Sequence, residues 1–236
     1  MLITSIGSVC FTKWQVCNAT GLEYLHCPLD NIQNNGIRQF DNILALLKEG
    51  YRQVEGTALE YREHAGTRLD GQAAEYHGYR YIGDQLSHEF ILAHFFDGNK
   101  IKTYLSEDEA WSRWHHKCQV FGEALESGEE LALVSLRLED DDAEARAYLW
   151  HSLLKLAEYI RLAYNRDETN THLISLIATD AQEVTTEHQT PMAAQILIPS
   201  AEEKGTPYYK RQYRDEYKDA VLKHLGDKHN DHQHNN

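Results

Sequence analysis

The sequence predicts an α/β fold, in which helices pack on the faces of a mostly parallel central sheet. Apolar runs of strand length alternate along the chain with longer segments whose apolar residues recur at helical spacing. Hydrophobic residues make up 42% of the 236 positions, which is enough to fill one core. We expect residues 1–226 to form a single domain and the His- and Asn-rich residues 227–236 to be a disordered tail.

The chain begins with an expected strand and an expected helix. Residues 1–6 are a short apolar run that ends at Gly7. The segment after Gly7 has apolar residues at helical spacing, and residues 18–21 would end that helix. The following "HCPLDNIQNNG" predicts a loop, because proline, asparagine and glycine favour turns.

The middle of the chain predicts one helix and several strands. The apolar residues from Ile37 onward fall on one helical face, and Gly50 would end that helix. Residues 51–78 are polar and irregular, so the pattern assigns no element to them. The aromatic and β-branched residues of "YRYIGDQLSHEFILAHFF" favour strands, with a turn at Gly83 and Asp84.

The second half of the chain shows the clearest alternation of helices and strands. Ser106 and Glu109 spell a capping box, and the helix that they begin would end at Gly128. The segments "ELALVSLRL", "THLISLIAT" and "AAQILIP" predict strands. A helix is expected at "DDDAEARAYLWHSLLKLAEYIRLAY", since aspartates favour a helix N-terminus. A last helix carries its apolar residues at Tyr213, Tyr217, Val221, Leu222 and Leu225.

Composition and charge exclude several classes of function. A net charge of −14 argues against binding to nucleic acid through phosphate neutralisation. No apolar run approaches the roughly 18 residues that span a bilayer, so we expect no membrane partner. The N-terminus has no basic region followed by a long apolar run, and Lys13 interrupts the only candidate, so we expect no signal peptide. The four cysteines are few and irregularly spaced, which predicts reduced thiols and a cytoplasmic location. Their spacing matches no zinc pattern, so no metal is expected.

Cys10 is the candidate nucleophile. It follows Gly7 where an expected strand turns into an expected helix, and backbone N–H groups are unpaired at a helix start. Such a position lowers the pKa of a thiol and can stabilise an oxyanion. Gly7 would permit the turn, and Ser8 would add a hydroxyl or an amide, so both are candidate oxyanion- or substrate-binding residues. The alternative is that Cys10 is a small buried residue without a chemical role.

Several short motifs resemble those of a bacterial family of papain-like cysteine peptidases. They are "SIGSVC", "CPLDNI", "LSHEF" and "LALVSLRLEDDD". The family has a Ser-Leu-Gly-x-x-Cys start, a Pro-Phe-Asp-Trp motif, a His-Asp-Phe segment and a strand that ends in arginine. By element order the resemblance covers roughly the first three quarters of the chain. It suggests a papain-like α+β fold as the alternative architecture.

The resemblance implies roles for individual residues. Cys10 would be the nucleophile, His88 the general base, and Arg137 a substrate-binding residue. Asp30 also matches the family, and it would orient the His88 imidazole, which needs a third group for that purpose. Asp97 is the alternative for this orienting role. The sequence departs from the family's Phe, Trp and Asp at Leu29, Asn31 and Glu89.

These residues predict a cysteine-dependent hydrolase of the peptidase or amidase type that uses no cofactor. His88 suits the role of base because the ordinary pKa of histidine lies near neutrality. The resemblance also admits an acyltransferase, because bacterial polysaccharide-biosynthesis proteins with a comparable start use coenzyme A for acyl transfer. A third interpretation is a non-enzymatic, partner-binding domain in which Cys10 is inert. The sequence does not indicate whether the substrate is a peptide, a glycan or a small molecule.

Overall fold

The computed structural model describes most of the chain. The residues outside the description are 8–11, 34–36, 51–58, 68–72, 82–89, 93–105, 138–141, 200–214 and 235–236.

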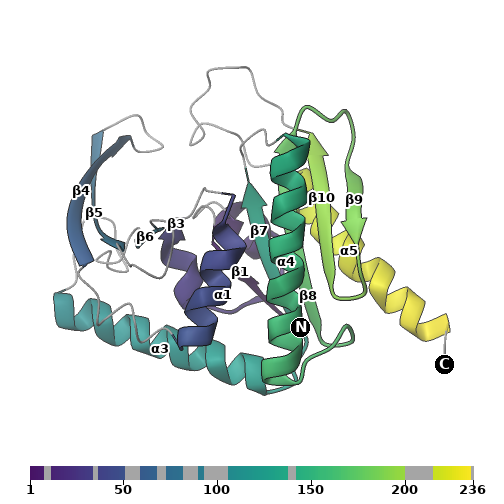
Figure 1. Ribbon diagram of the computed structural model, residues 1–236, viewed down its shortest axis with the longest axis horizontal. Helices are drawn as coiled ribbons and strands as arrows, with labels where there is room; N and C mark the ends of the chain where they lie inside the picture. Colours follow the sequence, from purple (N-terminus) through teal and green to yellow (C-terminus); the bar gives the residue numbers. More distant parts are fainter. Residues whose placement is uncertain are drawn as a thin grey trace.

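A six-stranded sheet forms the centre of the molecule (Figure 1). Its strands are β1 (Leu2–Ser5), β2 (Glu23–Tyr24), β7 (Leu131–Arg137), β8 (Thr171–Thr179), β9 (Thr185–Gln189) and β10 (Ala193–Pro199). Their order is β2-β1-β7-β8-β10-β9, and all neighbours are parallel except β9, which pairs antiparallel with β10. The central strands β7 and β8 are buried along their whole length, as parallel strands covered on both faces must be. The predicted α/β class is therefore confirmed.

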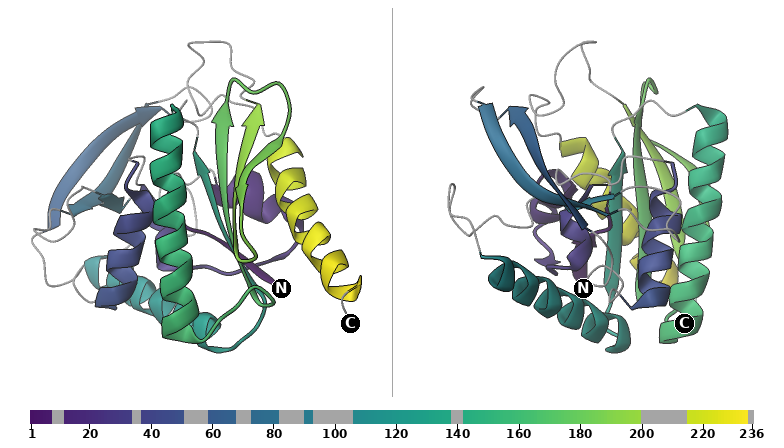
Figure 2. Two further views of the ribbon diagram at one scale, coloured as in Figure 1. Left: turned by 45° about the vertical axis from the view of Figure 1, so that its right-hand side comes forward. Right: turned by 60° about the vertical axis from the view of Figure 1, so that its left-hand side comes forward.

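Helices cover both faces of this sheet (Figure 2). One face carries α1 (Gln39–Glu49), α3 (Glu107–Glu126) and α4 (Ala143–Tyr164). The other carries the π-helical turn η1 (Thr12–Cys17), the 3-10 turn η2 (Asn18–Thr20) and α5 (Asp215–His234). Successive strand residues alternate between the two layers, so that Leu131 and Leu133 contact the first layer and Ala132 and Val134 the second.

The structure contains a second, antiparallel sheet, which the sequence of residues 51–78 did not predict. It consists of β3 (Ile32–Gln33), β4 (Leu59–Thr67), β5 (Ala73–Tyr81) and β6 (Phe90–Leu92), in the order β3-β6-β5-β4. It lies near the N-terminal end of α3, on the side of α1 away from α4 (Figures 1 and 2). The sequence of β4 and β5 lacks a sustained apolar alternation, which explains why the pattern did not reveal these strands.

The secondary structure confirms most predicted elements and corrects a few. The capping box of α3 is present, with Ser106 accepting a hydrogen bond from the Glu109 amide and Glu109 accepting one from the Ser106 amide. The segment expected as a loop after Gly21 contains the 3-10 turn η3 (Pro28–Asn31) and β3. The expected helix after Gly7 is present as η1 and η2, in π and 3-10 form, and Gly21 ends it in the left-handed conformation.

Three further expectations differ from the structure. Ile37 precedes α1 and is 41% exposed, so it does not belong to the helix's apolar face. Leu222 is 37% exposed because the buried stripe of α5 runs through Tyr217, Val221 and Leu225. α5 also continues to His234, through most of the segment expected to be a disordered tail, because no proline interrupts its backbone hydrogen bonds there.

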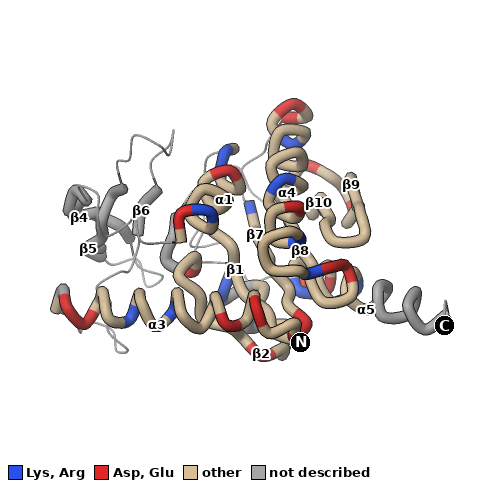
Figure 3. Tube along the Cα trace, turned by 60° about the horizontal axis from the view of Figure 1, so that its bottom comes forward, with Lys and Arg blue, Asp and Glu red and all other residues tan. Residues whose placement is uncertain are grey.

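Charged residues are interspersed along the helices rather than gathered by sign. Residues of both signs occur along each of α1, α3 and α4 (Figure 3). This distribution agrees with an acidic but mixed surface. Among the residues that the structure describes, every helix is too short or too polar to cross a membrane.

Candidate functional site

The elements that follow β1 and β7 in the sequence lie on opposite faces of the sheet. β1 leads toward η1, which packs with α5, whereas β7 leads toward α4 on the other face. In an open α/β sheet, ligands bind in the crevice between the carboxyl ends of two such strands. Ser5 at the end of β1 is opposite Val134, and β7 continues past that level to Arg137. In the sequence, Cys10 follows β1, one of the two strands that flank this position.

Gly7 has the turn-forming role that the sequence predicts. It follows the end of β1 with a φ of 75°, in the left-handed region that favours glycine. A Cβ atom at Gly7 would lie 3.4 Å from the Cδ1 atom of Ile43 in α1, so a side chain here would also be tightly packed. Arg137 ends β7 and is only 2% exposed, and its role in substrate binding stays a prediction.

Four other residues of the prediction lie outside the described part of the chain. Ser8 and Cys10 fall in residues 8–11, His88 in residues 82–89, and Asp97 in residues 93–105. The pairing of Cys10 with His88 therefore stays a proposal.

Asp30 is the predicted site residue whose surroundings are described most fully. It lies in η3, and its side chain is only 2% exposed. Its Oδ1 atom accepts a hydrogen bond of 3.0 Å from the Ser5 hydroxyl and another from the Tyr24 hydroxyl. The Cys27 thiol points at the same oxygen from 3.8 Å. Because Ser5 and Tyr24 end the neighbouring strands β1 and β2, Asp30 lies at the sheet edge where β2 stops.

The other oxygen of Asp30 faces three basic side chains. Its Oδ2 atom lies 3.8 Å from Lys117 Nζ, 3.9 Å from Lys13 Nζ and 3.8 Å from His26 Nδ1. Lys13 belongs to η1 and Lys117 to α3, so the two lysines come from opposite layers of the fold. We call this set of residues the Asp30 cluster: Ser5, Lys13, Tyr24, His26, Asp30 and Lys117.

The Asp30 cluster keeps a buried carboxylate ionised. Burial alone would raise the pKa of Asp30, but the nearby His26, the charges of Lys117 and Lys13 and the Tyr24 hydrogen bond outweigh it and hold that pKa below its ordinary value. Burial and the charge of Asp30 raise the pKa of the Tyr24 phenol, so that Tyr24 remains a hydrogen-bond donor. The pKa of Lys117 is lowered by burial, and the charge of Asp30 opposes that shift.

The buried cysteines near the cluster are poor nucleophiles. Cys17 and Cys27 are both fully buried. Burial raises the pKa of each thiol, and the negative charge of Asp30 raises it further. Since the thiolate is the reactive form, neither residue is suited to attack a substrate. Cys118 is half-buried on α3 and packs against the core, as its place on the helix's apolar stripe predicts.

The sequence revealed only part of this cluster. Asp30 was found through its motif, whereas nothing in the pattern indicated Lys13 or Lys117. Lys117 lies on α3, far along the chain, and only the packing of α3 beside η3 brings it to Asp30. Ser5 and Tyr24 occupy strand ends, where a hydroxyl carries no distinctive signal.

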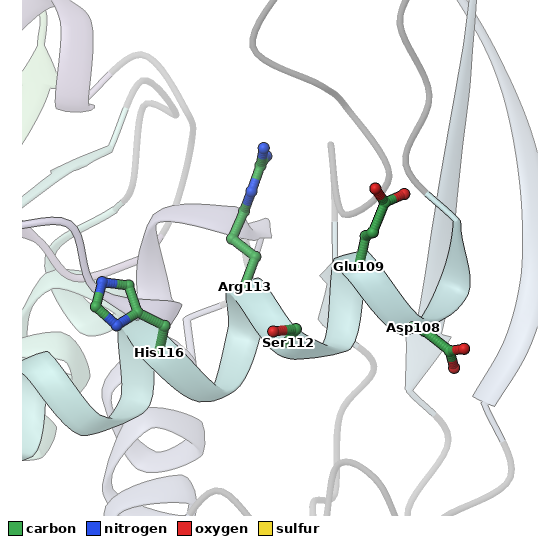
Figure 4. Close-up of a pocket in the computed structure, with 5 residues that line it drawn as sticks. All are labelled: Asp108, Glu109, Ser112, Arg113 and His116. Carbon is green, nitrogen blue, oxygen red and sulfur yellow. The ribbon is translucent and has the colours of Figure 1, made fainter.

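A shallow hollow also lies on the surface of α3. Figure 4 shows it between Asp108, Glu109, Ser112, Arg113 and His116. All of these residues come from one helix, and the Glu109 carboxylate already serves the capping box with Ser106. The hollow contains none of the predicted site residues. Within the described part of the chain, no three His, Cys, Asp or Glu residues are grouped as metal ligands.

No family model matches the chain, and no match to it was found among curated proteins or solved structures. The assignment of its function therefore depends on the geometry and chemistry of this chain.

Proposed function

We propose that this protein is a cysteine-dependent hydrolase, in which Cys10 is the nucleophile and His88 the general base. The observation that carries the proposal is the turn at Gly7, which comes just after the end of β1, a strand whose following element η1 lies on the opposite face of the sheet from α4, which follows β7. Cys10 follows Gly7 by three residues and precedes η1 in the sequence.

The other cysteines support this choice by exclusion. Cys17 and Cys27 are buried thiols with raised pKa values. Cys118 is engaged in the packing of α3 against the core. Cys10 follows the end of β1 by five residues in the sequence.

The proposed reaction divides hydrolysis into two steps. His88 accepts the thiol proton of Cys10, and the thiolate attacks the carbonyl carbon of an amide or thioester. The bond to the leaving amine or thiol breaks as His88 returns the proton to it, which leaves a thioester on Cys10. Water then attacks this thioester with His88 as the base, releasing a carboxylic acid and the Cys10 thiol. Gly7 and Ser8 would supply backbone N–H groups to the oxyanion that develops in both steps.

A titration of thiol reactivity tests the pair. Iodoacetamide labelling of each cysteine is followed by peptide mass spectrometry over a range of pH. We expect Cys10 to react well below the pH at which an ordinary thiol does, because His88 stabilises its thiolate. His88→Ala should remove this effect, whereas His151→Ala, at an exposed histidine of α4, should leave it unchanged. The proposal fails if Cys10 labels no faster than Cys118.

An activated ester distinguishes hydrolysis from transfer. With p-nitrophenyl acetate we expect a burst of nitrophenolate and a transient acetyl group on the Cys10 peptide, followed by acetate release in the absence of any acceptor. Coenzyme A that raises the melting temperature and is required for turnover would instead identify an acyltransferase. No acetyl group on Cys10 would contradict both enzymatic alternatives.

A further inference from the structure

The Asp30 cluster connects parts of the chain that lie on either side of the proposed nucleophile. Ser5 is the last residue of β1, before Cys10, and its hydroxyl donates to Asp30. Lys13 is in η1, after Cys10, and its ammonium group lies 3.9 Å from Asp30. One buried carboxylate therefore binds the strand that precedes Cys10 and the helical turn that follows it.

The same carboxylate also fixes the surrounding layers. Lys117 brings α3 to Asp30 from one face of the sheet, and Lys13 brings η1 from the other. The Lys117 and Lys13 side chains are only 12% and 19% exposed, so water weakens these ion pairs less than it weakens pairs on the surface. Tyr24 adds a hydrogen bond from the end of β2.

We propose that Asp30 is a positioning residue, which fixes η1 and α3 against the end of β1, and not the partner that orients His88. Its effect on catalysis, as distinct from its effect on the fold, rests on the proposed function. The donors around Asp30 support this assignment. A carboxylate offers about four lone-pair sites. Four groups already surround Asp30: Ser5 and Tyr24 donate hydrogen bonds to Oδ1, and the ammonium groups of Lys13 and Lys117 lie 3.9 and 3.8 Å from Oδ2.

The charge of Asp30 allows an experiment to distinguish a positioning role from a purely electrostatic one. A carboxylate close to a thiol raises the pKa of that thiol, as Asp30 does for Cys17 and Cys27. If Asp30 acted on Cys10 only through its charge, its removal would make Cys10 more reactive. Loss of positioning has the opposite effect, because it loosens the backbone on either side of Cys10 and the N–H groups that would stabilise its thiolate, whether or not His88 is present.

Amide hydrogen exchange tests the structural part of the proposal. We expect exchange across residues 12–20 to become roughly tenfold faster in Lys13→Met and in Asp30→Asn, because each loses a buried ion pair that holds η1. Lys13→Arg should restore slow exchange. The matched control is Asp41→Asn, since Asp41 also accepts a tyrosine hydrogen bond, 2.6 Å from the Tyr148 hydroxyl, but joins α1 to α4. Unchanged exchange over residues 12–20 in both cluster variants would overturn the proposal.

A double-variant comparison tests the catalytic part. Asp30→Asn should slow Cys10 alkylation roughly tenfold at about pH 7, both in the native background and in His88→Ala. If the effect disappears in His88→Ala, Asp30 acts through His88 and the proposal is wrong. Faster alkylation of Cys10 in Asp30→Asn would also overturn the proposal, since Asp30 would then act on Cys10 mainly through its negative charge. An unreactive Cys10 in the native protein would refute the proposed function, while the exchange experiment would still decide the structural role of Asp30.

Discussion

At the scale of single residues, Asp30 shows how a buried charge can be stable in this fold. Burial alone would favour the neutral acid, but basic groups from η1, α3 and the chain after β2 favour the carboxylate. The sequence motif made Asp30 a candidate site residue. It did not identify Lys13 or Lys117, because ion-pair partners that are distant in sequence become neighbours only through packing.

The buried thiols give a prediction at this scale. In the folded protein at about pH 8, we expect iodoacetamide to leave Cys17 and Cys27 unmodified, because burial raises their pKa values and excludes the reagent. Peptide mass spectrometry after timed labelling measures this. The same cysteines should label readily once urea unfolds the chain. Rapid labelling of either residue in the native state would contradict the described packing.

At the scale of secondary-structure elements, Arg166 connects the C-terminal end of α3 with the starts of β7 and β8. Its guanidinium donates hydrogen bonds to the carbonyls of Ala124 and Leu125 in α3, at 2.9 and 3.2 Å. It also donates to the carbonyl of Glu129, just before β7, and to that of Asn170, just before β8. The residue is 2% exposed, and its guanidinium supplies one donor to each of these four carbonyls.

Removal of this guanidinium should destabilise the protein strongly. We expect Arg166→Met to lower the free energy of unfolding by roughly 3 kcal/mol, since several buried carbonyls lose their donor. Urea denaturation measures the change. Arg161→Met provides the control, because Arg161 pairs with Glu158 on the exposed surface of α4, and a change of less than about 0.5 kcal/mol is expected there. Equal effects of the two substitutions would refute the role assigned to Arg166.

Whether a strand could be predicted from the sequence depended on how much of it is buried. The strand segments "THLISLIAT" and "AAQILIP" coincide with β8 and β10, because strands covered on both faces must be apolar throughout. The sequence of β9, "TTEHQ", has no such signal, since this strand lies at an edge and is mostly exposed. The helix start at Ser106 could be predicted because a capping box is a local interaction.

At the scale of the whole molecule, the lowered pKa of Asp30 links stability to pH. A folded-state pKa below the unfolded value stabilises the protein above about pH 4, and this contribution is lost as the pH falls through the folded-state value. We therefore expect the difference in unfolding free energy between the native protein and Asp30→Asn to shrink between about pH 6 and about pH 3. Urea denaturation at several pH values measures it. A difference that stays constant or grows on acidification would contradict an ionised Asp30.

The α/β class could be predicted at this scale, whereas the full architecture could not. Alternation of apolar strand and helix patterns is a property of the sequence, and it predicts a parallel sheet with helices on its faces. The order of the strands and the presence of a second sheet depend on long-range pairing. The strands β4 and β5 pair mainly with each other, so their sequences need not show the continuous apolar pattern of the central strands.

A crystal structure with ordered Cys10 and His88 side chains tests the central claim most directly. The distance to measure joins the Cys10 Sγ atom to the nearer ring nitrogen of His88. We predict about 4 Å or less, close enough for the imidazole to take the thiol proton. Side chains on separate faces of the molecule, or a sulfur enclosed by the core, would contradict the account.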